Sequence, residues 1–292
     1  MKFPLMFITC LAHFFLLILL STTAFAKASG TYPASIVELT IPSYGKRMSG
    51  LAYLAKGAGP HPTIVLLHGY PGNEKNLDVA QAMRSRGWTV IFFHYRGAWG
   101  SEGEFSFRGA ERDVQQVLAY LRDGKNAADL RINRNNISLV GHSMGGHMAI
   151  AGILDNPGVK CSVAYDGANL GAGGLGFFKE QQSAELWRSY SDTLFMLSGW
   201  SGAKAEGEIR QYGQKLDLVK RAANINGRPV LLIAANTEVI PIDQHIMPLK
   251  AALQASPNSR VSYRLIEDDH SFSSSRAELI DATASFLNNQ CR

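Results

Sequence analysis

The pentapeptide Gly141-His142-Ser143-Met144-Gly145 constrains the fold more than any other part of the chain. The apolar run Ile137–Val140 before it predicts a buried strand, and Met144–Leu154 after it predicts a helix. A serine on so sharp a strand-to-helix turn holds its Oγ above the sheet, and small neighbours are needed because larger side chains would collide in the bend. A G-x-S-x-G segment in this setting therefore predicts a nucleophile at Ser143.

Strand-like and helix-like segments alternate along the rest of the chain. The 46% of hydrophobic residues and 18% of charged residues allow a full core and exclude a disordered chain or a coiled coil. The alternation predicts an α/β fold, with a mostly parallel sheet of about eight strands flanked by helices. The expected strands are 36–41, 50–55, 63–67, 88–93, 136–140, 162–165, 229–234 and 261–266, and the expected helices are 76–86, 110–121, 144–154, 246–253 and 276–287.

The segment 170–227 interrupts this alternation, because it has helical pieces but no apolar strand run. So long a stretch between two strands is usually functional or a small subdomain. It is expected to form a helical cap or lid within a single domain of residues 27–292. Helical packing outside the sheet is the alternative.

One of the eight histidines must serve as a base if Ser143 is a nucleophile. His270 lies in Glu267-Asp268-Asp269-His270-Ser271-Phe272, between the last expected strand and the last expected helix. This loop belongs to the same carboxyl edge of the sheet as Ser143, where open α/β sheets place their sites. His142 and His147 flank the serine, but turn and helix geometry is expected to point them elsewhere. We therefore predict that His270 is the base.

A glycine-bearing turn, His68-Gly69-Tyr70-Pro71-Gly72, follows the expected strand 63–67. Such a turn can aim a backbone N–H at a developing oxyanion, and the second donor is the N–H of the residue after the nucleophile. The predicted oxyanion donors are the backbones of Tyr70 and Met144.

These motifs, together with Tyr95-Arg96-Gly97 and Trp99-Gly100-Ser101, resemble those of α/β-hydrolases. The resemblance covers about residues 36 to 289. Within the α/β-hydrolases, the motifs are most similar to those of the esterase and prolyl-oligopeptidase-like peptidase branch. It implies a serine hydrolase that cleaves a carboxylic ester or a short peptide through an acyl-enzyme, with Ser143 as nucleophile and His270 as base. It implies no cofactor, and a small molecule or short peptide as substrate.

The third catalytic residue is where the sequence departs from this family. The loop after strand 229–234 carries Thr237 at the position where the family usually has an aspartate, and a threonine cannot stabilise an imidazolium by charge. Three acids obey the order serine, acid, histidine. Glu238 ranks first because it adjoins Thr237, Asp166 second because it ends a strand at the same edge, and Asp243 third because a helix N-cap explains it equally well. The substitution at Thr237 also motivates an alternative function, a non-catalytic binding protein on a hydrolase scaffold.

The N-terminal segment predicts export. Lys2, an apolar run over residues 5–20 and the small-residue ending Ala24-Phe25-Ala26 have the layout of a signal peptide, so residues 1–26 are expected to be cleaved and the protein to be secreted or periplasmic. An uncleaved membrane anchor over residues 5–20 is the alternative. The mature chain keeps Cys161 and Cys291, and whether they pair stays open.

Charge and spacing narrow the expected partners. The net charge of +5 is spread thinly, which does not indicate a nucleic-acid surface. No H-E-x-x-H or C-x-x-C spacing occurs, so no metal site is expected. No stable membrane association is expected after cleavage, and the sequence leaves the oligomeric state open.

Overall fold

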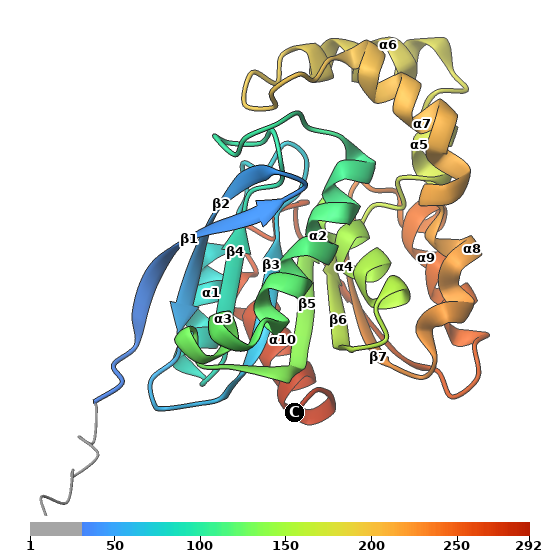
Figure 1. Ribbon diagram of the computed structural model, residues 1–292. Coiled ribbons are helices and arrows are strands. Elements are labelled where there is room, and N and C mark those ends of the chain that lie inside the picture. Colours follow the sequence, from blue (N-terminus) through green and yellow to red (C-terminus); the bar gives the residue numbers. More distant parts are fainter. Residues whose placement is uncertain (1–30) are drawn as a thin grey trace, which may run out of the picture. The chain divides into compact units, whose positions relative to one another are not determined.

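A twisted eight-stranded sheet runs through the protein, with strand order β1-β2-β4-β3-β5-β6-β7-β8 (Figure 1). The computed structural model describes residues 31–292, so the predicted signal peptide lies outside the described residues. The β1–β2 and β2–β4 pairs are antiparallel and every later pair is parallel, which confirms the predicted fold class. The strands are β1 (Ser35–Ser43), β2 (Lys46–Leu54), β3 (His61–Leu67), β4 (Thr89–Phe93), β5 (Ile132–His142), β6 (Val159–Tyr165), β7 (Pro229–Ala235) and β8 (Arg260–Ile266).

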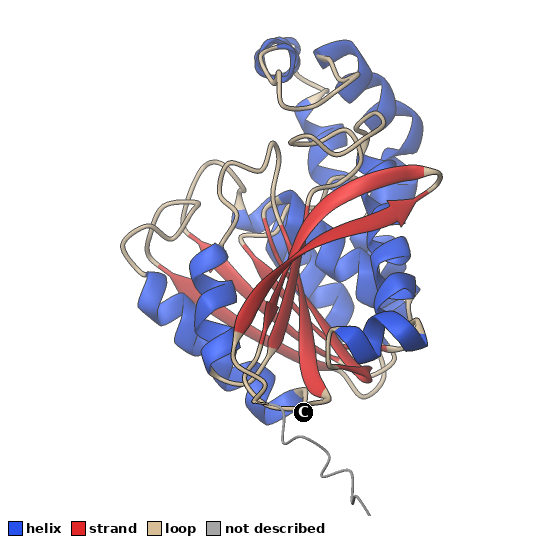
Figure 2. Cartoon of the chain, turned by 60° about the vertical axis from the view of Figure 1, so that its left-hand side comes forward, coloured by secondary structure: helices blue, strands red, loops and turns tan. Residues whose placement is uncertain are grey.

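Helices cover both faces of the sheet, and each face has its own apolar core (Figure 2). Three helices pack on one face, namely α2 (Phe107–Arg122), α4 (Met144–Asp155) and α9 (Ile242–Gln254). The other face is covered by α1 (Leu77–Ser85) and α10 (Arg276–Gln290). The short α3 (Gly124–Asp129) joins α2 to β5. The central strands are therefore buried on both sides, which explains their continuous apolar runs.

The segment between β6 and β7 folds into helices at one end of the sheet. It contains α5 (Ala172–Phe177), α6 (Gln181–Asp192), α7 (Gly202–Leu216), α8 (Leu218–Arg221) and a 3₁₀ turn (Ala222–Ile225). Figure 1 shows α6 and α7 above the edge at which the parallel strands end. We call residues 170–227 the cap. Tyr70 joins the cap to the core, because its hydroxyl donates to Ser191 Oγ at 2.8 Å and accepts from Trp200 Nε1 at 2.7 Å.

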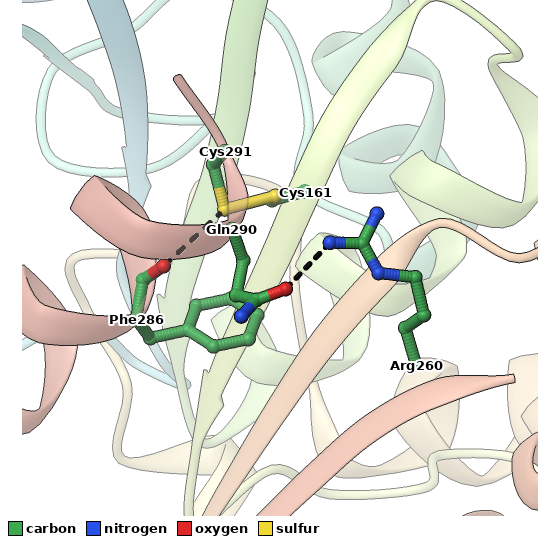
Figure 3. The surroundings of a disulfide bond; sticks show 5 residues. All are labelled: Cys161, Arg260, Phe286, Gln290 and Cys291. Atoms are coloured by element: carbon green, nitrogen blue, oxygen red, sulfur yellow. Dashed lines mark hydrogen bonds between the residues drawn. A yellow bond between two sulfur atoms is a disulfide. The ribbon is translucent and has the colours of Figure 1, made fainter.

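A disulfide links Cys161 of β6 to Cys291, which follows α10 (Figure 3). The two Cα atoms are 5.8 Å apart and both side chains are fully buried. Beside the bridge, Arg260 donates a hydrogen bond to Gln290 Oε1 at 2.5 Å. The C-terminal end of the chain is thus covalently attached to an inner strand of the sheet.

Within residues 31–292, no helix has the length and apolar character needed to cross a membrane.

Candidate active site

Ser143 occupies a strained turn between β5 and α4, as the sequence predicts. Its φ and ψ are 57° and −119°, a conformation that costs energy for a residue with a side chain and is typical of functional sites. A Cβ at Gly141 would lie 2.0 Å from the carbonyl oxygen of Gly145, and a Cβ at Gly145 would lie 2.0 Å from that of Leu67. Glycine is therefore required on both sides of the turn, which leaves Ser143 partly exposed.

His270 lies in the loop after β8 and pairs with Asp166. Its Nδ1 is 2.5 Å from Asp166 Oδ2. The Asp166 side chain is fully buried, whereas 20% of the His270 side chain remains exposed. Because a carboxylate can only accept, Nδ1 carries the proton in this pair, and Nε2 is left as the basic nitrogen of the neutral ring.

The structure corrects the ranking of the three acids, because it places Asp166 rather than Glu238 against His270. The Asp166 backbone N–H donates to the Ile233 carbonyl at 2.7 Å, and its Oδ1 accepts the Ala235 N–H at 3.2 Å, so β7 holds the carboxylate in place. Glu238 is exposed, and no hydrogen bond or ion pair to His270 is present among residues 31–292.

Asp243 is also exposed, and the described part of the chain shows no hydrogen bond or ion pair between it and His270. It lies in the first turn of α9, where its charge favours the helix N-terminus, but the N-cap position itself is occupied by Pro241. The sequence placed Asp166 and Asp243 in the right chain order, yet only tertiary packing shows which acid reaches the ring.

Ser143 and His270 face a common cavity of about 340 Å³ beneath the cap. Within residues 31–292 no hydrogen bond joins Ser143 Oγ to His270 Nε2. In serine hydrolases, such a bond often forms only when the substrate binds. Tyr70 and Met144, the predicted oxyanion donors, line the same cavity. Neither of their backbone N–H groups has a hydrogen-bond partner among the described residues, so both can donate to a bound molecule.

The cavity wall is mostly apolar, and the cap contributes six of its sixteen lining residues. None of its lining residues is a lysine, arginine, aspartate or glutamate. Phe107 contributes from α2, Trp187 and Tyr190 from α6, and Val239 and Ile240 from the loop after β7. The site therefore favours an uncharged group beside Ser143.

His142 has a role that the sequence analysis missed. It was expected to point away from the site, but its Nε2 lies 2.7 Å from the His270 carbonyl oxygen and the two ring centroids are 4.5 Å apart. Burial lowers the pKa of His142 to about 3, so the ring is neutral and donates its Nε2 proton to that carbonyl. No local pattern could reveal this contact, because it joins residues 128 positions apart.

His147 points away from Ser143, as expected, and belongs to a buried ionic cluster below the cavity. Its Nε2 lies 3.2 Å from Glu111 Oε1, and its Nδ1 accepts the Leu170 N–H at 3.3 Å. Arg221 of α8 donates to Glu111 at 2.7 Å and to Asp155 at 2.6 Å. The cluster thus ties both ends of the cap to α2 and α4.

Comparison with known proteins gives partial matches in sequence. Residues 51–163 match the BD-FAE family model. Two uncharacterized proteins from strains of Mycobacterium tuberculosis are 24% identical over 132 residues. That match covers 45% of this chain, and the chain spans about half the length of these relatives.

Solved structures match over most of the chain. Est1E from Butyrivibrio proteoclasticus, determined with bound ferulic acid, has a TM-score of 0.66 at 16% identity and covers 86% of this chain and 98% of its own. An esterase of Pyrococcus furiosus has a TM-score of 0.61 at 15% identity, covering 89% and 94%. The acylaminoacyl peptidase of Pyrococcus horikoshii has a TM-score of 0.63 at 18% identity, covering 91% of this chain and 42% of its own. Strand order, the turn at Ser143 and these likenesses together show that the chain has the α/β-hydrolase fold.

Proposed function

We propose that the protein is a serine hydrolase of uncharged carboxylic esters, with short-peptide or amide cleavage as the second possibility. The observation that carries this proposal is the 2.5 Å contact between His270 Nδ1 and the buried Asp166 carboxylate, beside a cavity that also contains Ser143. A serine nucleophile is activated when a nearby histidine takes its proton and a buried carboxylate orients that histidine.

In the proposed reaction, Ser143 Oγ attacks the ester carbonyl carbon while His270 Nε2 takes its proton. Asp166 accepts the Nδ1 hydrogen bond throughout, which keeps Nε2 basic and stabilises the imidazolium. The Tyr70 and Met144 N–H groups would hold the tetrahedral oxyanion. His270 then protonates the leaving alkoxide, and a water activated by the same ring releases the acid and regenerates Ser143.

The uncharged cavity supports ester cleavage ahead of peptide cleavage. A short peptide brings a terminal ammonium and a terminal carboxylate, and burying either charge without a partner is costly. No lysine, arginine, aspartate or glutamate lines the cavity that could pair with such a charge. Structural neighbours whose titles name esterases point the same way, although one neighbour is a peptidase.

We also propose that the protein works outside the cytoplasm. The predicted signal peptide at residues 1–26 motivates this proposal, and the buried Cys161–Cys291 disulfide supports it, because such bonds persist in oxidising compartments. Amino-terminal sequencing of the protein recovered from the periplasm or medium tests it, with Lys27 as the expected first residue. Recovery of Met1 in the cytoplasmic fraction would contradict it.

Labelling with a fluorophosphonate probe tests the catalytic proposal. Wild-type protein should label, and the Ser143→Ala variant should not. An unlabelled wild type, beside a known serine hydrolase that labels, would leave the binding-protein alternative. The motive for that alternative is weaker once Asp166 supplies the acid that Thr237 lacks.

Rates on p-nitrophenyl esters and on aminoacyl-nitroanilides then decide between ester and amide substrates. Faster turnover of the anilides would reverse the proposed order.

A further inference from the structure

His245 lines the cavity of Ser143, and one of its two ring nitrogens has no hydrogen-bond partner among residues 31–292. It lies in the first turn of α9, is 8% exposed and lines the cavity wall. The ring edge packs against Gly173 of α5, where a Cβ would lie 1.8 Å from His245 Cε1 and 2.5 Å from Nε2. The glycine-rich segment at residues 171–176, whose spacing alone has no clear function, therefore makes room for this ring.

One hydrogen bond fixes the tautomer of His245. The backbone N–H of Asn169 donates to His245 Nδ1 at 3.0 Å. Because Nδ1 accepts, a neutral ring must carry its proton on Nε2. Burial lowers the pKa of His245, although the charges of Asp166 and Asp243 oppose this effect, so the ring stays neutral at and above neutral pH. His245 Nε2–H is thus a fixed donor.

Two other polar side chains of the wall, those of Tyr70 and Asn169, already have partners. The Tyr70 hydroxyl bonds to Ser191 and Trp200, and the Asn169 side chain bonds to Asp217 and the Leu218 N–H. No partner for His245 Nε2 is found in the described part of the chain. When a bound molecule covers a donor in an apolar wall without accepting its hydrogen bond, the binding free energy becomes less favourable.

We propose that His245 is a specificity-determining residue whose Nε2–H donates a hydrogen bond to an acceptor oxygen of the substrate. The substrate class is then an uncharged ester whose apolar chain carries an ether or carbonyl oxygen within reach of α9. This inference rests on the proposed ester hydrolysis at Ser143 and adds the chemistry by which the cavity distinguishes one ester from another. A site built around such a donor discriminates against the analogue that lacks the acceptor.

An oxygen scan along the substrate tests this role. Rates are measured for p-nitrophenyl hexanoate and for its analogues in which one methylene beyond the α carbon is replaced by an ether oxygen, one position at a time. A second series places the oxygen along the alcohol chain of butyrate hexyl esters. The quantity of interest is kcat/KM for the ether ester divided by kcat/KM for the all-carbon ester, corrected for the same ratio in hydroxide hydrolysis. Each ratio is taken within one enzyme, so differences in the fraction of folded protein cancel.

Two variants separate the hydrogen bond from the shape of the ring. In His245→Asn the side-chain oxygen can replace Nδ1 as acceptor for the Asn169 N–H, but the pocket donor is gone. In His245→Gln the amide nitrogen reaches the position of Nε2 and can still donate. Wild type should prefer at least one ether ester by about tenfold, the Asn variant should lose that preference, and the Gln variant should keep part of it.

Three kinetic results would overturn the proposal. One is a flat scan in wild type, and another is a preference of equal size in wild type and His245→Asn. A preference lost equally in both variants would assign the effect to ring shape. Long-range ¹H–¹⁵N correlation spectra provide a readout without turnover, and a proton found on His245 Nδ1 would also refute the inference. Failure of the proposed function looks different, because wild type would then hydrolyse no ester in either series.

Discussion

Removing the disulfide should destabilise the folded protein by several kcal/mol. Cys161 and Cys291 are 130 residues apart in sequence, so the bond closes a large loop in the unfolded chain. Chain-entropy arithmetic for a loop of that length gives about 5 kcal/mol at 25 °C. Residual structure in the reduced unfolded chain lowers this figure, so we expect the double variant Cys161→Ala/Cys291→Ala to lose about 3 to 5 kcal/mol.

Equilibrium unfolding in urea, monitored by tryptophan fluorescence, measures this loss. Wild type treated with reductant and then with a thiol-blocking reagent is the matched control, because it opens the bond without changing the sequence. Both samples should show a lower midpoint than oxidised wild type. A loss below about 1 kcal/mol, or two free thiols in protein purified from an oxidising compartment, would refute the reasoning.

The remaining predictions concern the site and its supports. Asp166→Asn should lower kcat by about ten-thousand-fold with the fold intact, whereas Glu238→Gln should stay near wild type on the same ester; the reverse pattern would restore Glu238 as the acid. His142→Leu should lower kcat about tenfold or more by freeing the His270 carbonyl, and His142→Gln, which can still donate to it, should recover most of the rate; equal losses would exclude the hydrogen bond. Burial favours a raised pKa at Glu111, but its bonded partners hold that pKa at about 2, below the unfolded value of 4.5. Its stabilisation is therefore complete above pH 4.5 and is lost as the pH falls towards 2, so urea unfolding should show a loss of about 2 kcal/mol between pH 5 and pH 3 that Glu111→Gln lacks.

Local patterns predicted the elements that carry a strong apolar signal. The eight expected strands all form, and the inner ones, such as β4 and β7, are continuously buried because both faces of the sheet are covered. Boundaries shifted where pairing extends beyond the apolar run. β5 begins at Ile132, four residues before the expected start, because Ile132 pairs with His61 across polar residues. The helix α3 was missed because it is short and depends on its cap, in which Asp123 accepts from the Lys125 and Asn126 N–H groups.

In the candidate site, too, some residues could be predicted from the sequence and others depend on tertiary packing. The sequence could place Ser143 and His270 together because strand order brings both to one edge of the sheet, and both line the same cavity. The acid could not be chosen in this way, since three carboxylates satisfy that order and only the contact of Asp166 with His270 distinguishes them. The pairing of the two cysteines likewise depends on how α10 packs against β6, which no spacing in the sequence encodes.

The placement of the acid after β6 changes what the loop after β7 is free to do. With Asp166 as the proposed acid, residues 236–241 need not carry a carboxylate at a fixed point, and Thr237 Oγ1 has no hydrogen-bond partner among residues 31–292. Yet Val239 and Ile240 of this loop still form part of the cavity wall. Substitutions there can reshape the cavity beside Ser143 without changing Asp166, the proposed acid. The loop is therefore the natural segment in which natural variation or directed evolution would alter substrate preference first.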